Sequence, residues 1–165
     1  MRIVLYLSVV MAMTLSACGP PEASPQPEIQ YGRDVCVQCG MIANEAKFAA
    51  AYRHDGADFI FDDLGDLVVY ARTNSVDLDT AQTWVHDFET EEWIDGRVAH
   101  FVATTSVATP MGHGIVAFRD ATRAQDFADS LGGQVVDWET LMALPMDDGR
   151  VGMNGDTRVE MRMNE

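Results

Sequence analysis

Apolar and polar residues alternate over short stretches along much of this chain, a pattern that predicts strands at those places. The first two such stretches cover residues 47–52 and 58–61, and Asp55-Gly56 lies between them. Asp-Gly between two apolar runs is a strong hairpin signal, because both residues tolerate the left-handed backbone of a tight turn. We therefore expect an antiparallel pair of strands here.

A helical pattern follows this hairpin. Its apolar residues recur at intervals of three and four, which puts them on one helix face: Leu64, Leu67, Val68 and Ala71. Asp62 or Asp63 is a suitable N-cap, and the pattern ends near Arg72. Residues 83–89 then alternate as a strand would, and Trp93-Ile-Asp-Gly96 ends the unit.

The same order of elements recurs further along the chain. Strands are expected over 100–104 and 115–118, followed by a helix that Asp120 caps and Gly132-Gly133 ends, and by a strand over 134–138. The apolar face of this second helix consists of Ala121, Ala124, Phe127, Ala128 and Leu131. The repeated order predicts an α+β protein made of two related β-β-α-β halves in one compact unit.

The N-terminus has the pattern of a secretory signal: a basic start at Arg2, an apolar run over 3–15, and small residues before Cys18. The apolar run is too short for a permanent membrane span. Leu15-Ser-Ala-Cys18 is typical of a bacterial lipobox, in which the cysteine is lipidated, although a plain signal peptide could also end near a cysteine. We expect a lipid-anchored periplasmic protein, held in the inner leaflet of the outer membrane because no Asp follows Cys18.

These patterns divide the chain into four parts. Residues 1–17 are expected to be a lipoprotein signal peptide, and residues 18–30 the lipidated cysteine and a flexible tether rich in proline. The folded domain is expected over 31–140, with halves at about 31–97 and 98–140. Residues 141–165 form an acidic tail that contains methionine.

Charge narrows the choice of partners. The chain has 26 acidic and 11 basic residues, for a formal net charge of −15. Such a chain is a poor match for nucleic acid or for an anionic lipid surface, because both are negatively charged. A strongly acidic surface is compatible with attracting cations or docking on a basic partner, although it also serves solubility.

The most informative motif is Cys36-Val-Gln-Cys39-Gly40-Met41. Thiolate and thioether are soft ligands that together favour Cu(I), and Gly40 allows a tight turn that points Cys39 and Met41 at one place. C-x-x-C alone also fits a zinc site, a redox pair or a plain disulfide. Zinc would need a second ligand pair, which the sequence lacks, and a thioredoxin-like site would need a strand before the motif.

Met111-Gly112-His113-Gly114 is a second candidate, because a thioether and an imidazole are both acceptable ligands for Cu(I). The competing interpretation is an ordinary loop methionine and a surface histidine. Signatures of catalysis, such as G-x-S-x-G, HExxH or a phosphate-binding loop, do not occur in the sequence, so we expect a protein that is not an enzyme.

The chain resembles the NosL family over residues 34–138. The motifs that carry the resemblance are the lipobox at Cys18, the Cys-Gly-Met segment, Phe59-Ile-Phe-Asp-Asp63, Trp93-Ile-Asp-Gly96, Met111-Gly112 and Ala117-Phe118. The resemblance implies two β-β-α-β halves and a Cu(I) metallochaperone for nitrous oxide reductase. It also implies a partner complex of ABC type with a periplasmic β-helical subunit.

Carried over position by position, the family implies Cys39, Met41 and Met111 as copper ligands, with Cys36 and His113 as further candidates. The copper could sit within one chain or between two chains of a homodimer. Two other hypotheses stay open at this point. One is a periplasmic thiol-disulfide oxidoreductase that uses the C-x-x-C pair, and the other is a structural lipoprotein with a disulfide clip.

Overall fold

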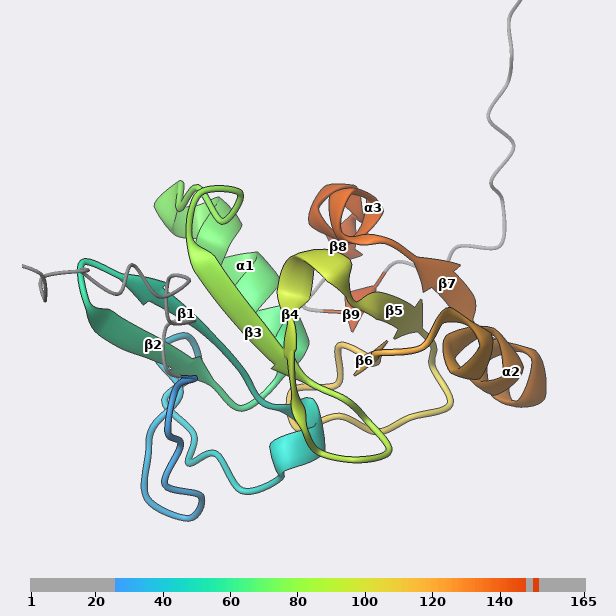
Figure 1. Ribbon diagram of the computed structural model, residues 1–165, viewed down its shortest axis with the longest axis horizontal. Helices are drawn as coiled ribbons and strands as arrows, with labels where there is room; N and C mark the ends of the chain where they lie inside the picture. Colours follow the sequence, from blue (N-terminus) through green and yellow to red (C-terminus); the bar gives the residue numbers. More distant parts are fainter. Residues whose placement is uncertain (1–25, 148–149, 152–165) are drawn as a thin grey trace, which may run out of the picture.

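The computed structural model, which describes residues 26–147 and 150–151, consists of two small antiparallel sheets, each accompanied by a helix (Figure 1). The first unit, coloured teal to lime in Figure 1, contains a four-stranded sheet in the order β2-β1-β3-β4. The second unit contains a three-stranded sheet in the order β6-β5-β7. The predicted α+β class with two related halves is confirmed.

The first unit begins with a short 3-10 helix and continues through a hairpin, a helix and two further strands. Its elements are η1 (Ala46–Phe48), β1 (Ala50–His54), β2 (Ala57–Phe61), α1 (Leu64–Asn74), β3 (Gln82–His86) and β4 (Trp93–Asp95). The predicted Asp-Gly hairpin is present, since Asp55 and Gly56 both have positive φ, at 50° and 78°. The strand that we expected from Lys47 starts at Ala50 instead, because residues 46–48 form the 3-10 helix.

Helix α1 forms as the sequence indicates. The Asp63 side chain caps it by accepting a hydrogen bond from the Gly65 N–H at 2.9 Å. The four apolar residues of the predicted face are all buried. Ser75, in the left-handed conformation with φ 54°, ends the helix. The start of α1 is therefore fixed firmly at the end of β2.

The second unit repeats this order with η2 (Gly96–Val98), β5 (His100–Ala103), β6 (Ile115–Phe118), α2 (Ala121–Leu131) and β7 (Gln134–Val136). Asp120 caps α2 by accepting from the N–H groups of Thr122 and Arg123. The predicted apolar face of α2 was partly wrong. Ala124 and Ala128 are buried, but Ala121 and Leu131 are exposed, because the sheet beneath α2 has only three strands and leaves the helix ends uncovered.

A further helix was missed. The predicted strand over 134–138 ends at Val136, and α3 (Trp138–Ala143) begins under the cap of Asp137. Leu141 on α3 is fully buried, so the packed part of the chain continues past residue 140. A two-stranded ribbon of β8 (Met146–Asp147) and β9 (Arg150–Val151) follows.

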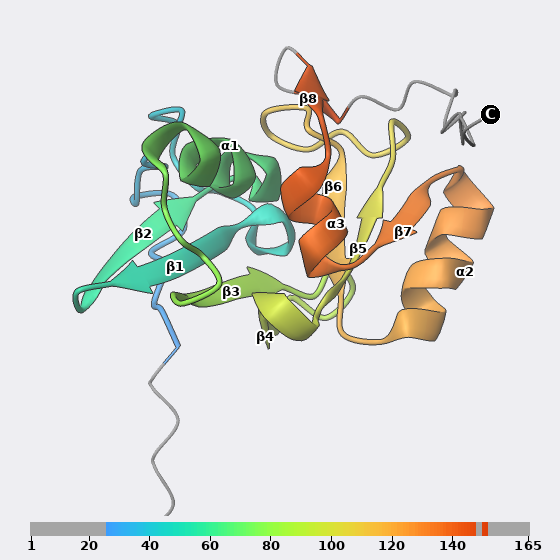
Figure 2. The same cartoon turned by 90° about the horizontal axis from the view of Figure 1, so that it is seen from above.

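The core joins the two units. One cluster of buried apolar residues combines α1 and β1 of the first unit with β5, β6 and α3, and Figure 2 shows α3 between α1 and β7. A parallel bridge between Asp87 and Ala117 links the end of β3 to β6. The loops of one unit therefore have fixed positions on the other.

The structure does not test two of the predictions for the N-terminus. The signal segment and Cys18 lie outside the described residues, as does the chain beyond Val151. Within the described part, no helix has the length and apolar character needed to cross a membrane.

Candidate metal centre

The C-x-x-C-G-M segment forms a tight loop that faces the start of α1. The Cys36 N–H donates to the Met41 carbonyl at 2.8 Å, and the Gly40 N–H donates back to the Cys36 carbonyl at 3.0 Å. Gly40 has φ 75°, a backbone conformation that glycine adopts without strain. The Val37 N–H donates to the carbonyl of Ile60, so the loop is held along the outer edge of β2.

Each thiol of the loop meets a carboxylate from the beginning of α1. The Cys36 thiol, which is buried, donates to Asp66 at 3.2 Å, and the half-buried Cys39 thiol donates to Asp62 at 3.1 Å. Both cysteines are free. One ligand atom from each of these four residues lies within 4.8 Å of the other three. Two sulfur and two oxygen donors so arranged fit the requirements of a metal ion.

Burial has the largest influence on the pKa of both thiols. Desolvation raises the pKa of Cys39 strongly, and hydrogen bonds to Asp66, Cys36 and Asp62 raise it further, so the group is a neutral thiol in this state. Burial also raises the pKa of Cys36, and the backbone N–H groups of Cys39 and Asp62 partly offset that rise. Loss of the thiol protons therefore needs a cation close by.

The second unit reaches the same place through His113. Its Nε2–H donates to Asp66 at 2.9 Å, and both side chains are only 4% exposed. Burial alone would raise the pKa of Asp66, but the hydrogen bonds from His113, Cys39 and Cys36 outweigh burial and lower it. Burial would likewise lower the pKa of His113, but the hydrogen bond to Asp66 and the neighbouring aspartate charges raise it. The hydrogen bond between His113 and Asp66 thus joins the two units.

Asp63 makes a second connection between the units. Its other carboxylate oxygen accepts from the Thr109 hydroxyl at 2.6 Å and from the Met111 N–H at 2.9 Å. Burial raises the pKa of Asp63, and these donors offset that rise only in part. The loop that carries Met111 is therefore tied to the residue next to Asp62.

The sequence-predicted residues are thus only partly brought together. Cys36, Cys39 and His113 all contact the acidic start of α1. Met111 is anchored beside it through its backbone and is 38% exposed, and Met41 is 48% exposed in the cysteine loop. The assignment of these two methionines as ligands stays a prediction. His113 is buried, so the interpretation of an ordinary surface histidine was wrong.

The carboxylates of Asp62 and Asp66 were missed as site residues. Asp62, Asp63 and Asp66 all fall within five positions where the sequence predicts the start of a helix. Helix capping explains one of these acidic residues. The other two could have indicated a site at this end of the helix.

The fold and the site together define a small two-unit α+β protein with a group of side chains, lined by sulfur and carboxylate, that could hold a metal ion. The chain belongs to the NosL family, whose family model matches residues 29–143. The family indicated by the sequence resemblance is therefore confirmed.

A solved structure supports the fold. The chain is similar to the crystal structure of the copper chaperone NosL from Shewanella denitrificans, with a TM-score of 0.61 and 20% sequence identity. The match covers 69% of this chain and 93% of that chain. No curated protein matches the sequence.

Proposed function

We propose that this protein binds Cu(I) at the Cys36–Met41 loop and hands it to an acceptor protein. The observation that carries the proposal is the pair of free thiols at the start of α1, one buried and one half-buried. Membership of the NosL family and the likeness to a copper chaperone point the same way. In this proposal the protein carries the ion as cargo and passes it on.

The ligand types favour Cu(I). Thiolate and thioether sulfur are soft donors. Met41, in the cysteine loop, and Met111, whose N–H donates to Asp63, add two exposed thioethers. Cys39 is the ligand that exchanges with the acceptor protein, because it is the more accessible of the two thiols. Exposed methionines give an incoming acceptor access to the ion from the solvent side.

Binding must release protons. The thiolate is the form of cysteine that binds metal, and both thiols are protonated in the metal-free state. Asp62 and Asp66 already accept the two S–H hydrogen bonds, so each thiol proton lies between a sulfur and a carboxylate. Their negative charges also attract the cation.

The cellular setting follows from the N-terminus and the family. We infer a periplasmic protein that is lipid-anchored at Cys18. We also infer that its client is apo nitrous oxide reductase, served through the ABC-type maturation complex with a periplasmic β-helical subunit. The excess of acidic over basic residues, 26 to 11, fits docking on a basic surface.

The thiol-disulfide alternative fits less well. Reactive redox cysteines have lowered pKa values at helix N-termini or beside cations. Here burial raises the pKa of both thiols, and their side chains face carboxylates. A disulfide between them would remove both thiolates from the candidate metal centre.

A transfer experiment tests the proposal. The Cu(I)-loaded protein is mixed anaerobically with membranes that contain the maturation complex and with apo nitrous oxide reductase. We expect copper to appear in the reductase and its activity to rise. Cys39→Ser should abolish both effects, whereas Met142→Ala on α3 should leave them unchanged. Equal delivery by free Cu(I) and by the loaded protein would contradict the proposal.

A further inference from the structure

A second loop in the chain repeats the backbone of the cysteine loop. In residues 36–41 the first N–H donates to the last carbonyl at 2.8 Å, and the same bond joins Asp87 to Glu92 at 2.8 Å in residues 87–92. The Gly40 N–H donates to Cys36, as the Glu91 N–H donates to Asp87. The two loops therefore have the same hydrogen-bond pattern, position by position.

The two loops also have the same place in their units. The Val37 N–H donates to the Ile60 carbonyl near the end of β2, and the Phe88 N–H donates to the Ala117 carbonyl near the end of β6. Gly40 has φ 75°, and its counterpart Glu91 has φ 57° although it is not a glycine. A side chain in this conformation is strained, so the surrounding structure must impose the shape of the second loop.

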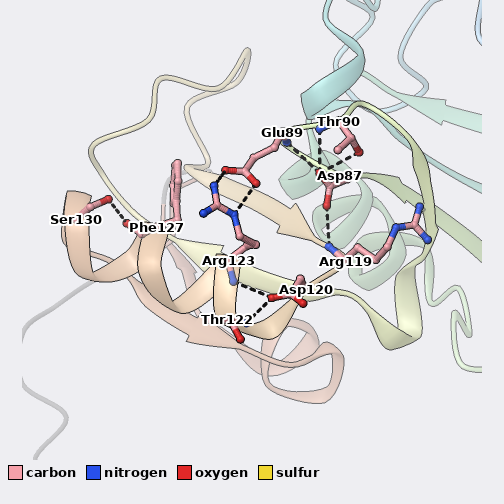
Figure 3. Close-up of polar contacts among 9 residues, drawn as sticks. All are labelled: Asp87, Glu89, Thr90, Arg119, Asp120, Thr122, Arg123, Phe127 and Ser130. Carbon is pink, nitrogen blue, oxygen red and sulfur yellow. Dashed lines mark hydrogen bonds and ion pairs between the residues drawn. The ribbon is translucent and has the colours of Figure 1, made fainter.

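The first side chain of each loop sits among matching N–H groups. The Cys36 sulfur accepts a hydrogen bond from the Cys39 N–H at 3.5 Å, and the backbone N–H groups of Gln38 and Asp62 also favour its negatively charged form. The Asp87 carboxylate accepts from the counterparts of these three, at 3.1, 2.9 and 2.8 Å, namely Glu89, Thr90 and Arg119 (Figure 3). Asp87 therefore occupies the position of Cys36, in a group of N–H donors that suits a negatively charged atom.

The remaining ligand positions differ in charge. Thr90 stands where the first loop has Cys39. Counted from the helix caps Asp63 and Asp120, Arg119 and Arg123 stand at the positions of Asp62 and Asp66. Arg119 pairs with Glu92 at 3.2 Å. Arg123 pairs with Glu89, and Figure 3 shows this second pair. The second loop thus has permanent cations where the first has acids.

We propose that residues 87–92 are a duplicate of the metal-binding loop, and that Arg119 and Arg123 close this duplicate to metal ions. This proposal rests on the proposed function, which assigns metal binding to the first loop. Fixed positive charges at both carboxylate positions repel an incoming cation, and they neutralise the acids of the loop that could attract one. Of the two duplicate loops, only the one in the first unit consequently binds the ion.

Exchange of the side chains between the loops tests this proposal. The forward variant carries Asp87→Cys, Thr90→Cys, Arg119→Asp and Arg123→Asp in a chain whose own site is removed by Cys36→Ser and Cys39→Ser. Co(II) is the probe, because thiolate ligation gives it a strong absorption band. We expect about one equivalent of thiolate-bound Co(II) in this variant and none in the Cys36→Ser, Cys39→Ser parent.

The reverse variant carries Cys36→Asp, Cys39→Thr, Asp62→Arg and Asp66→Asn, because the neutral amide at the buried position 66 keeps an acceptor for His113. We expect it to fold with a cooperative thermal transition and to take up no Co(II). The control is Arg33→Asp with Arg97→Asp, which makes the same change of charge as Arg119→Asp with Arg123→Asp. It should add no thiolate-bound Co(II).

Two results would overturn the proposal. One is a folded forward variant without thiolate-bound Co(II), while the unaltered protein binds it. The other is failure of both variants to fold, since duplicate loops should tolerate exchange. Lack of metal binding by the unaltered protein would instead count against the proposed function, and the folding of the reverse variant would still test the relation between the loops.

Discussion

At the residue scale, Gly65 decides how closely the two units approach at the candidate metal centre. A Cβ atom at this position would lie 2.2 Å from Cγ of His113 and 2.3 Å from its Cβ. These atoms are near the backbone and cannot swing away as the tip of a flexible side chain could. The absence of a side chain at Gly65 thus lets His113 reach Asp66.

We therefore predict that Gly65→Ala destabilises the protein by about 1–3 kcal/mol, the usual cost of overpacking a filled core. The substitution should also weaken metal binding, because it displaces His113 from Asp66. Urea denaturation and a metal titration measure the two effects.

His113→Gly provides the control for this prediction, because it removes both the Cβ and the Cγ atom that a Cβ at position 65 would meet. Combined with Gly65→Ala, it removes the clash, so the double variant should be about as stable as His113→Gly alone. Additive losses of stability in the double variant would show that the contact between Gly65 and His113 is not the cause.

Asp87 is the second residue with a large expected effect. Its buried carboxylate accepts from three backbone N–H groups and the Thr90 hydroxyl. Burial would raise the pKa of Asp87, but the N–H donors of Arg119 and Thr90 outweigh burial and lower it. Since the pKa in the folded state lies below the unfolded value of about 3.9, the charge stabilises the fold above that pH.

Asp87→Asn should accordingly cost about 1–3 kcal/mol at neutral pH. The difference from the unaltered protein should shrink as the pH falls below about 4, because protonation then removes the same charge from the unaltered protein. Thermal unfolding from pH 7 to pH 3 measures this difference. Asp129→Asn on the exposed part of α2 is the matched control, and an Asp87 effect that is constant over this range would contradict the explanation.

At the element scale, helix α3 depends on a contact that the sequence pattern does not show. The Arg72 guanidinium, from α1, donates to the carbonyls of Leu141 and Met142 at the end of α3, at 2.7 Å for its shortest bond. The last carbonyls of a helix have no partner within the helix, so an arginine here satisfies them. A helix of six residues needs such tertiary contacts, because short helices are not stable alone.

Arg72→Met should loosen α3, because the last carbonyls of the helix lose their hydrogen-bond donor. The expected cost is only about 1 kcal/mol, since water can replace the exposed guanidinium at the same carbonyls. The Leu141 and Leu144 amides should exchange hydrogen faster, while the amides of β1 stay protected. Arg33→Met is the matched control. Unchanged exchange in α3 would show that the buried side chain of Leu141 suffices to hold the helix.

Some elements of the fold could be predicted from local sequence, and others could not. Helices α1 and α2 have a cap and an apolar period within one stretch of eleven residues, so local sequence determines them. The end of the last predicted strand was wrong, because α3 is too short to display a period. The burial of α2 was overestimated, since its coverage depends on the number of strands beneath it.

At the scale of the whole molecule, the site is assembled from distant segments. Cys39 was predicted from its motif, but its carboxylate partner Asp62 and the contact between Asp66 and His113 join segments that only the fold brings together. The relation between the two loops could not be predicted either. Residues 34–42 and 85–93 share no identical residue when aligned, and only the hydrogen bonds reveal their likeness.

We propose that the cysteine loop and the Met111 loop together hold one Cu(I) between the two units. The most direct test is an anaerobic Cu(I) titration of the reduced protein carrying Cys18→Ser, in competition with a chromophoric Cu(I) chelator. We predict one Cu(I) per chain, and an affinity at least about tenfold weaker, or about 1.4 kcal/mol, in both Cys39→Ser and Met111→Ala. Binding that does not depend on Cys39 would contradict the account.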